Sequence, residues 1–196
     1  MTKAEIRKEI LAKRDSLTED EISTKSRAIF EKLLCQDEYK EAENILIYAS
    51  FGSEVRTDEI ILDSLAMGKN VYCPKVTDRK NGEMKFVKIM SLEDLSKGYF
   101  GIREPELNED SVVFGDNVSD DACLCKALVV VPGVAFDRHL DRIGYSGGFY
   151  DRFLDKNESV NTIALAFDVQ IVDYDIPREM HDKSLQIIIT EEHVLV

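Results

Sequence analysis

The 196-residue sequence predicts an α/β protein with a mostly parallel sheet. Short runs rich in β-branched residues alternate along the chain with segments of helical periodicity. The most apolar run, residues 127–136, is continuous, as buried central strands are. A glycine cluster at 144–148 follows it and leads into another helical segment. Ligands of open α/β sheets bind at such strand-to-helix connections, so this cluster is the first candidate site.

Helices are predicted where N-terminal capping signals precede an apolar stripe. Residues 2–5 and 18–21 both read T-x-x-E, which is a capping box, and isoleucines and leucines follow each at helical spacing. A third helix is expected to begin at Thr57 and to end at Gly68. Residues 150–155, directly after the glycines, also have a helical pattern.

Six runs rich in β-branched and aromatic residues predict strands. They are residues 44–50, 70–76, 83–90, 127–136, 162–167 and 185–190. Pro74 is expected to end the second strand, because proline cannot donate to a sheet ladder. The alternating pattern of the third strand predicts a half-exposed position.

The charge balance limits the classes of partner. The formal net charge is -13 and the pI is about 4.7. A nucleic-acid surface needs clustered lysine and arginine over a broad face, so no nucleic-acid partner is expected. A small anionic ligand needs only a local basic pocket and stays possible.

The cysteines and the apolar runs indicate where the protein works. Cys35, Cys73, Cys123 and Cys125 are scattered, without the spacing of most zinc sites, which favours reduced thiols in a cytoplasmic protein. The charged N-terminal residues do not resemble a signal peptide, and no apolar run is long enough for a membrane. We expect one domain over residues 1–196, working as a monomer, with the acidic segment 107–121 as a solvated connection.

The stretch "DRIGYSGGFYD", residues 141–151, has two interpretations. On glycine count alone a tight structural turn is favoured, because the pattern matches neither common nucleotide-binding fingerprint. However, Arg138 and Arg142 could clamp phosphate oxygens, and the exposed N–H groups of a helix start bind anions. Asp151 would repel a phosphate unless Mg²⁺ lay between them, so the charge order suggests a magnesium–nucleotide site. Alternatively, Asp151 stabilises the first helical turn and pairs with an arginine.

Other candidate residues are weaker when taken singly. Lys3 and Arg7 share a helix face, which is usually solvated. Glu54 and Lys75 follow strand ends, where they are either ligand-binding residues or ordinary loop residues. The three histidines have no metal spacing, and no nucleophile elbow or hydrolase triad is present in the sequence.

Taken together, the motifs resemble those of the 5-formyltetrahydrofolate cyclo-ligase family, also called 5,10-methenyltetrahydrofolate synthetases. "VPGVAFDRHLDRIGYSGGFYDRFL" (131–154) is similar to the long family signature. Shorter elements agree in order along nearly the whole chain. They are "KAEIR" (3–7), "YASFGSEVRT" (48–57), "PKV" (74–76), "GIREP" (101–105) and "IPREMHDKSLQIIIT" (176–190).

The resemblance implies a three-layer, Rossmann-like fold with helices on both faces of the sheet. It also implies ATP- and Mg²⁺-dependent cyclisation of 5-formyltetrahydrofolate to 5,10-methenyltetrahydrofolate, with release of ADP and phosphate. The formyl oxygen would first be phosphorylated, so the substrates are small molecules and no covalent protein nucleophile is required.

The same resemblance implies a role for each matching residue. Arg142 and Tyr150 would be catalytic, and Asp151 and Asp182 would bind the metal. The folate side would contain Ala49, Glu54, Tyr145 and Phe149, with the Glu54 carboxylate on the pterin. The ATP site would consist of Lys3, Arg7, Lys75, Arg142, Gly144, Tyr145, Ser146, Gly147, Gly148, Phe149 and Tyr150.

Four positions depart from the family pattern. Leu140 and Ser146 replace glycines, Phe149 replaces a tyrosine, and Arg56 stands where an acidic residue is common. These changes keep a second hypothesis open, that the chain is a catalytically impaired folate- or nucleotide-binding relative. A third is an unrelated Rossmann-like sugar-phosphate isomerase, which would need neither ATP nor metal.

Overall fold

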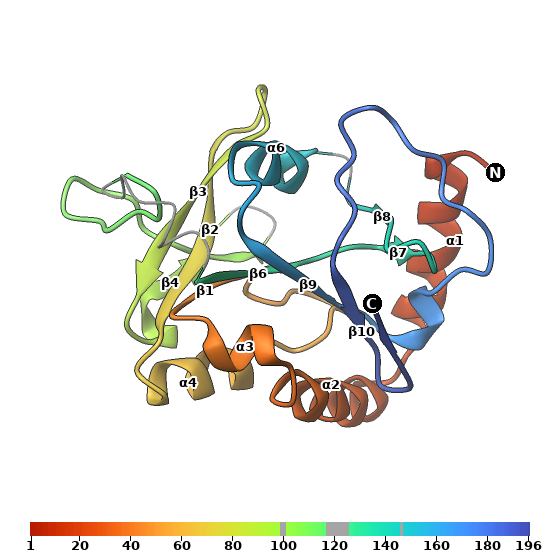
Figure 1. The fold of residues 1–196 in the computed structure, drawn as a ribbon, viewed down its shortest axis with the longest axis horizontal. Helices are drawn as coiled ribbons and strands as arrows, with labels where there is room; N and C mark the ends of the chain where they lie inside the picture. Colours follow the sequence, from red (N-terminus) through yellow and green to blue (C-terminus); the bar gives the residue numbers. More distant parts are fainter. Residues whose placement is uncertain (99–100, 117–125, 146) are drawn as a thin grey trace.

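The computed structural model describes residues 1–98, 101–116, 126–145 and 147–196. A seven-stranded sheet in the order β11-β10-β9-β6-β1-β2-β3 forms the centre of the molecule (Figure 1). The five inner strands are parallel, and the edge strands β3 and β11 are antiparallel to their neighbours, which confirms the predicted mostly parallel sheet. The strands are β1 (Asn44–Ile47), β2 (Asn70–Asp78), β3 (Glu83–Ile89), β6 (Ala127–Val131), β9 (Asn161–Leu165), β10 (Ile187–Ile189) and β11 (Val194–Leu195).

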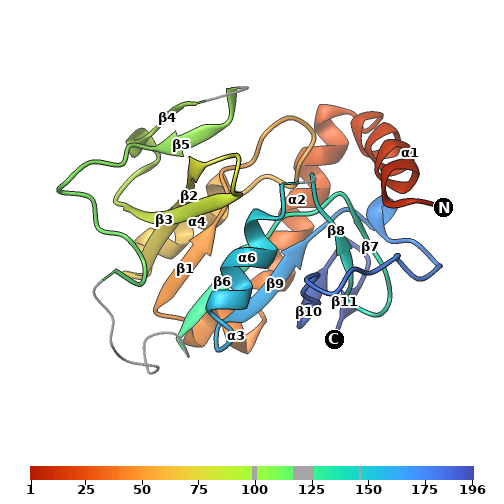
Figure 2. The same cartoon turned by 90° about the horizontal axis from the view of Figure 1, so that it is seen from above.

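Helices cover both faces of this sheet, as the three-layer prediction requires. The helices α2 (Glu19–Leu33), α3 (Asp37–Glu41) and α4 (Asp58–Ala66) lie on one face, and α6 (Phe149–Lys156) lies on the other (Figures 1 and 2). Helix α1 (Lys3–Asp15) packs beside the sheet, against the short strand β7 (Ala135–Phe136) and the 3-10 turn η3 (Asp168–Gln170). Within the described ranges, no helix combines the length and apolar character needed to cross a membrane.

Both predicted capping boxes are present. The side chain of Thr2 accepts a bond from the N–H of Glu5 at 3.3 Å, and the Glu5 carboxylate accepts one from the N–H of Thr2 at 2.8 Å. Thr18 and Glu21 repeat both bonds at the start of α2. The apolar stripe of α2 is buried, as its spacing predicts, at Ile22, Ile29, Phe30 and Leu33.

The core forms on both faces of the inner strands. Every residue of β1 and of β6 is buried. Successive side chains alternate between faces, so Ile45 and Ile47 join the cluster that contains α2 and α4, and Leu46 joins the cluster under α6. A smaller cluster fastens α1, through Ile6 and Ile10, to residues that follow β6. The carboxyl ends of the parallel strands therefore lie next to α1 and to the glycine loop.

The structure changes the extent of several predicted strands: β1 ends at Ile47 rather than at residue 50, and β10 covers only Ile187–Ile189 of the predicted 185–190. Two further strand predictions were wrong for reasons that involve proline. Strand β2 continues through Pro74 to Asp78, because beyond Tyr72 it is paired only with β3 and proline needs no bond toward β1. Residues 127–136 do not form one strand. Pro132 and Gly133 end β6, and the chain then enters β7, which pairs with β8 (Arg142–Ile143).

A second small sheet stands beside β2 and contains β4 (Leu95–Lys97) and β5 (Arg103–Pro105), preceded by the 3-10 turn η1 (Leu92–Asp94). The acidic segment that follows is not wholly solvated, since Val113 and Phe114 are buried and Val113 bridges to β3. Residues 117–125, which include Cys123 and Cys125, lie outside the described ranges.

Candidate active site

The turn that leads into the glycine loop is organised around one buried carboxylate. Asp137 is 1% exposed. Its Oδ1 accepts the N–H groups of His139 at 2.9 Å and Asp141 at 3.1 Å, and its Oδ2 accepts the N–H of Ile176 at 2.8 Å. These bonds shape the turn and fasten it to the segment that contains Ile176. Asp137 therefore fixes the turn from β7 to β8, the strand that begins with Arg142 five residues later.

We expect Asp137→Asn to lower the free energy of unfolding by about 3 kcal/mol. The side-chain NH2 group of asparagine would face a backbone N–H donor at a place where a carboxylate oxygen now accepts its hydrogen bond. Urea unfolding measures this change. Asp173→Asn is the matched control, because the Asp173 carboxylate is 88% exposed and pairs with the exposed Arg138. The Asp173→Asn variant should therefore be as stable as the unchanged protein. Equal stabilities for both variants would contradict the role given to Asp137.

Leu140, one of the positions that depart from the family pattern, has φ 64° and is the only non-glycine residue with positive φ in the described part of the chain. A leucine in this conformation costs about 1 kcal/mol relative to glycine. Its side chain packs against the core under α6, and its carbonyl accepts the N–H of Leu185 at 2.9 Å. The turn thus keeps the shape that a glycine would adopt.

The glycines of the loop serve different purposes. Gly148 precedes α6 at φ 62°, a left-handed conformation that favours glycine. A Cβ on Gly147 would lie 2.2 Å from the Phe149 ring, so packing requires this glycine. A Cβ on Gly144 would meet no atom within 4 Å. Gly144 therefore has open space beside its backbone, where a ligand could approach. Ser146 lies outside the described residues.

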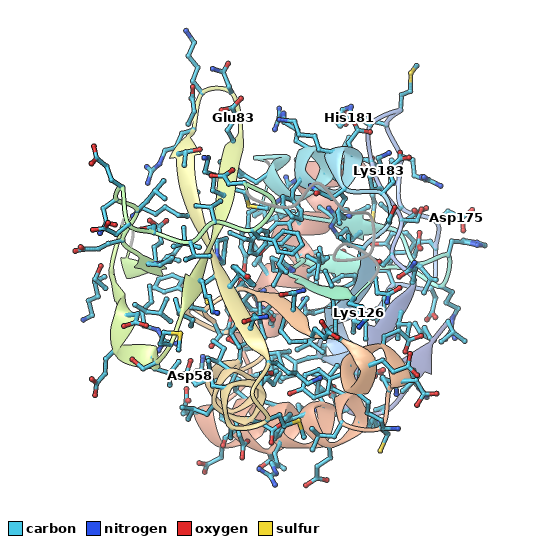
Figure 3. The ribbon with its side chains drawn as sticks, turned by 60° about the vertical axis from the view of Figure 1, so that its left-hand side comes forward. Asp58, Glu83, Lys126, Asp175, His181 and Lys183 are labelled. Carbon is cyan, nitrogen blue, oxygen red and sulfur yellow. The ribbon has the colours of Figure 1, made fainter. Side chains whose placement is uncertain are left out.

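Arg142 and Asp151 are brought together across the loop. The Arg142 side chain is 4% exposed, and its guanidinium donates to Asp151 Oδ1 at 2.8 Å and to the carbonyl of Lys183 at 2.6 Å. Asp151 Oδ1 also accepts the Lys183 N–H at 3.2 Å. The segment that contains His181 and Lys183 thus lies against the start of α6 (Figure 3).

Two basic residues of α1, Arg7 and Lys3, contact the glycine loop and the neighbouring segment 179–182 respectively. Arg7 Nε donates to the carbonyl of Gly144 at 2.8 Å. Lys3 Nζ binds Asp182 Oδ2 at 2.6 Å and Glu179 at 3.1 Å. Burial alone would raise the pKa of Asp182, but the bonds from Lys3 and from the Glu179 N–H lower it, so this carboxylate is ionised.

A second group of side chains adjoins the same loop. Tyr145 donates its hydroxyl hydrogen to Glu54 Oε1 at 3.0 Å and accepts a bond from Arg14 at 2.7 Å. The N–H of Phe51 binds Glu54 Oε2 at 3.0 Å. Burial raises the pKa of Glu54, and the Phe51 N–H and the Arg14 charge oppose that shift. Glu54 and Tyr145, both predicted on the folate side, are thus in direct contact.

A narrow cleft runs beneath Glu54, at the carboxyl ends of β1, β6 and β9. It contains about 160 Å³ of empty space, too narrow for a water-sized sphere. Its lining consists of Arg14, Tyr48, Glu54, Val55, Pro132, Gly133, Leu165 and Gln170. A ring-shaped ligand could enter this cleft only if the side chains that line it move apart.

The remaining predicted residues are more dispersed. Ala49 is buried just after β1. Lys75 Nζ binds Glu104 at 2.9 Å rather than a residue of the loop. Tyr150 packs edge-on against Phe86, and its hydroxyl is the only buried side-chain oxygen or nitrogen without a hydrogen-bond partner in the described ranges.

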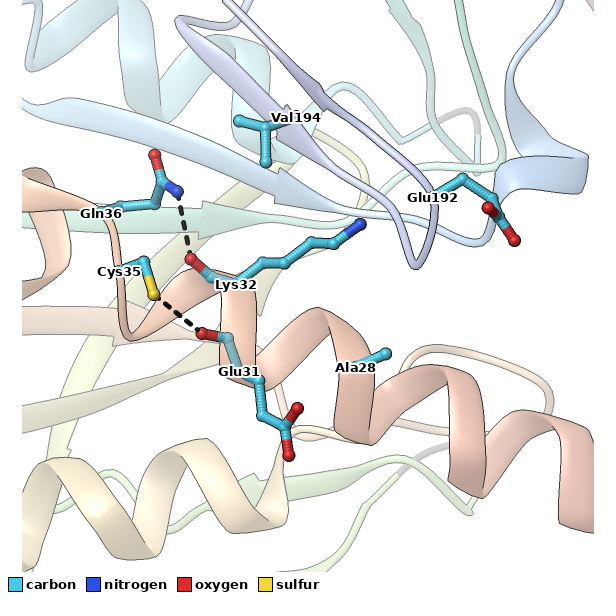
Figure 4. A pocket seen from close by; sticks show the side chains of 7 residues that line it. All are labelled: Ala28, Glu31, Lys32, Cys35, Gln36, Glu192 and Val194. Atoms are coloured by element: carbon cyan, nitrogen blue, oxygen red, sulfur yellow. Dashed lines mark hydrogen bonds between the residues drawn. The ribbon is translucent and has the colours of Figure 1, made fainter.

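A larger but shallow hollow lies far from this loop, between α2 and the β10–β11 hairpin (Figure 4). Cys35 and Gln36 bond there to carbonyls of α2, and Lys32 Nζ donates to the carbonyls of Thr190 and Glu191 at 3.0 and 2.6 Å. The polar side chains of Lys32, Cys35 and Gln36 are thus bonded to backbone carbonyls of the protein.

Sequence reasoning missed Arg14 and Asp137. Arg14 lies two helical turns after Arg7, so the spacing of these arginines on one face of α1 was the available signal. Asp137 stands inside the quoted motif, but only the fold shows that three N–H groups converge on it.

The fold and the loop together define an α/β protein with an anion-compatible glycine loop at the carboxyl edge of its sheet. The family model described as "5-formyltetrahydrofolate cyclo-ligase family" matches residues 1–191. The chain belongs to this family and is therefore an enzyme of the ligase class.

Relatives and solved structures agree with that assignment. A 5-formyltetrahydrofolate cyclo-ligase of Haemophilus influenzae is 31% identical, covering 92% of this chain and 93% of its own, and one of Mus musculus is 27% identical, covering 95% and 92%. The solution structure of 5,10-methenyltetrahydrofolate synthetase from Aquifex aeolicus matches with a TM-score of 0.79 and 29% identity, covering 99% and 92%. The Mycoplasma pneumoniae synthetase, at 22% identity, covers 97% and 99% with a TM-score of 0.73 and shares the fold.

Proposed function

We propose that this chain converts 5-formyltetrahydrofolate to 5,10-methenyltetrahydrofolate in a reaction that needs ATP and Mg²⁺ and releases ADP and phosphate. One observation carries the proposal: a single loop joins the Arg142–Asp151 pair to the Glu54–Tyr145 pair. The proposed phosphate site and the proposed ring site would therefore adjoin each other at the carboxyl edge of the sheet. The family and the names of the relatives support the cyclo-ligase reaction itself.

The chemistry requires activation of an amide oxygen. The formyl oxygen attacks the γ-phosphorus of ATP, an O–P bond forms, and the bond from that phosphorus to ADP breaks. The nitrogen at position 10 then attacks the formyl carbon and loses its proton. Phosphate leaves with the former formyl oxygen, which yields the closed ring. Most of the acceleration comes from positioning and from stabilising charge, since no protein nucleophile takes part.

The basic residues around the loop are proposed to hold the phosphates. Arg7 contacts the loop from α1, and Lys3 binds Asp182 on the neighbouring segment. Arg142, from β8, presents a guanidinium fork suited to phosphate oxygens. Lys3 and Arg142 are neutralised by Asp182 and Asp151, so binding of phosphates would exchange one anionic partner for another. Lys75 is a more remote contact, and Ser146 keeps its proposed place in the loop.

Tyr150 is proposed to act with Arg142 in catalysis. Burial raises the pKa of Tyr150, so its hydroxyl stays protonated and can donate. Since that hydroxyl has no partner within the described residues, a ligand oxygen would satisfy a buried donor that otherwise lacks a bond.

The folate is proposed to bind on the Glu54 side of the loop. A guanidine-like pterin edge offers paired N–H donors, and a carboxylate accepts two of them. Tyr145 and Phe149 would line this side, with Ala49 beneath. Each Glu54 oxygen already accepts one bond, from the Tyr145 hydroxyl or from the Phe51 N–H, and has a second lone pair for an N–H of the ring.

The proposed metal ligands fit Mg²⁺ in their chemistry. Magnesium bound to a nucleotide needs only one or two carboxylates, besides phosphates and waters. Asp151 and Asp182 are carboxylates on adjoining segments. Asp151 accepts its hydrogen bonds through Oδ1 and Asp182 accepts its own through Oδ2, so the other oxygen of each carboxylate is left for the metal. The described residues contain no cluster of three or more potential metal ligands. When bound, Mg²⁺ would neutralise charge between these carboxylates and the phosphates.

We expect Asp151→Asn to lower turnover about 100-fold and to raise the Mg²⁺ concentration needed for half-maximal rate about tenfold. The amide oxygen can still accept from Arg142 and Lys183, so the loop keeps its shape while the metal loses an anionic ligand. Initial rates over a magnesium titration measure this effect.

Asp155→Asn is the matched control, one turn later on α6, where the carboxylate is 68% exposed and binds Lys183 at 2.8 Å. Its magnesium dependence should be that of the unchanged enzyme. If Asp151→Asn has an unaltered magnesium dependence, Asp151 is not a metal ligand.

The direct test of the function is a turnover assay. The protein is mixed with 5-formyltetrahydrofolate and Mg-ATP, and the near-ultraviolet absorbance of methenyltetrahydrofolate is followed. Product must form in proportion to enzyme and only with ATP. Ligand binding without product would instead support the impaired relative, whereas family membership leaves the isomerase hypothesis without support.

We also propose that residues 1–196 work as a single-domain monomer in the cytoplasm, without a nucleic-acid partner. The free thiol of Cys35 and the net charge of -13 support this setting. Light scattering after size exclusion tests the monomer, and a mass of twice 22.3 kDa would exclude it.

A further inference from the structure

We propose that Arg14 is a positioning residue that holds the Glu54 carboxylate charged and aimed at the folate ring. Arg14 is 4% exposed, which is rare for an arginine on an outer helix. Its Nε donates to Ser53 Oγ at 3.0 Å, and its second branch donates to the Tyr145 hydroxyl at 2.7 Å. The inference rests on the proposed function and adds a residue to the folate side of that site.

Arg14 reaches Glu54 from two sides. Through Tyr145, whose hydroxyl bonds to Oε1, it fixes one carboxylate oxygen. Through Ser53, it fixes the residue that directly precedes Glu54 in the chain. Arg14 and Glu54 also line the same narrow cleft, so their opposite charges face each other in a space without room for water. In such surroundings the attraction between charges is much stronger than in water.

The spacing on α1 supports a shared task. Arg7 and Arg14 lie two turns apart on one face, and they contact the neighbouring loop residues Gly144 and Tyr145. One helix face therefore serves both halves of the loop. Arg7 meets the phosphate side, and Arg14 meets the folate side.

The electrostatic role follows from the groups around Glu54. Burial raises its pKa, and the Phe51 N–H, Arg14, the Tyr145 hydroxyl and Arg56 lower it. Two other groups, Tyr48 and Tyr150, also face it. Burial and then the charge of Glu54 raise the pKa of each, so both tyrosines are neutral and supply no opposing charge. The Arg56 guanidinium is itself paired with the Glu19 carboxylate, which reduces its effect on Glu54. Arg14 is thus the principal cation that keeps Glu54 ionised.

The direction of the pH effect is fixed by this arrangement. Glu54 accepts paired N–H groups only when ionised, so folate recognition falls as the pH drops through its pKa. Removal of the Arg14 charge raises the pKa of Glu54 further. The fall in kcat/KM on the acid side of the pH profile, its acid limb, then moves to higher pH. A role in stability alone would lower activity without moving this limb.

The experiment compares Arg14→Met and Arg14→Lys with the unchanged enzyme. The value of kcat/KM for 5-formyltetrahydrofolate is measured at saturating Mg-ATP from about pH 5 to pH 9. Arg14→Met should raise KM for the folate about tenfold and move the acid limb up by about one unit. Arg14→Lys keeps the charge but loses the fork, so KM should rise about threefold with the limb unmoved. The KM for ATP should stay within about twofold in both variants.

Lys13→Met, which removes the neighbouring exposed charge that pairs with Glu9, is the control and should match the unchanged enzyme. An unmoved acid limb in a folded Arg14→Met overturns the inference. If Arg14→Met does not fold, an unaltered folate KM in Arg14→Lys overturns it. Absence of any product from the unchanged enzyme would instead refute the proposed function, so the two failures are distinguishable.

Discussion

Arg142→Ala is expected to lower kcat/KM for ATP by about 1,000-fold, which is the scale of losing a preorganised charged donor at a phosphate. The side chain is almost fully buried and already oriented by Asp151 and the Lys183 carbonyl, so little ordering is needed when phosphates bind. Steady-state kinetics with varied ATP measure the loss. The melting temperature should fall as well, because the partly buried Asp151 would lose its arginine partner.

Arg138→Ala is the control for this prediction. Both arginines precede the glycines, and the sequence allowed either to clamp a phosphate. In the structure Arg138 is 65% exposed and paired with Asp173 at 3.2 Å, whereas Arg142 is directed into the loop. Arg138→Ala should therefore keep normal kinetics. Equal losses in both variants would mean that general positive charge, rather than the fixed fork of Arg142, supports the reaction.

Local signals in the sequence predicted the elements well. Both capping boxes form, and the apolar runs at β1 and β6 are buried as central strands, because these features depend on neighbouring residues. The prediction that Pro74 ends its strand was wrong, because a strand accepts proline where the neighbouring strand has already ended. The pairing of β1 with β2 ends at Tyr72, which depends on the whole sheet and not on the residues around Pro74. The positive φ of Leu140 could be suspected only from the resemblance of this stretch to a signature with glycine at that position.

The sequence proposes members of the site but not the contacts between them. Matching motifs pointed to Glu54 and Tyr145, and the structure adds that they bond to each other. Arg14 was passed over because an isolated arginine on a charged helix is normally solvated. Its burial arises where α1, the Ser53 loop and the glycine loop meet, and no local pattern encodes that meeting.

Glu54→Gln should raise KM for 5-formyltetrahydrofolate about 100-fold, with the KM for ATP within about twofold. Glutamine has the same shape, but only one of its terminal atoms accepts hydrogen bonds, so its amide would oppose an N–H of the ring. The acid limb that belongs to Glu54 should also disappear. Glu19→Gln, a 74% exposed carboxylate paired with Arg56, serves as the control and should leave the folate KM unchanged. A normal folate KM in Glu54→Gln would remove this carboxylate from the ring site.

The double variant with Arg14→Met and Glu54→Gln separates a direct contact from an indirect one. If Arg14 acts on the folate only through Glu54, it has nothing left to position once the carboxylate is gone. The double variant should then have the folate KM of Glu54→Gln alone, about tenfold below the product of the two single effects. Fully multiplicative effects would mean that Arg14 contacts the substrate itself. The cycle therefore tests whether the contacts of Arg14 with Ser53 and Tyr145 act on the ring through the Glu54 carboxylate.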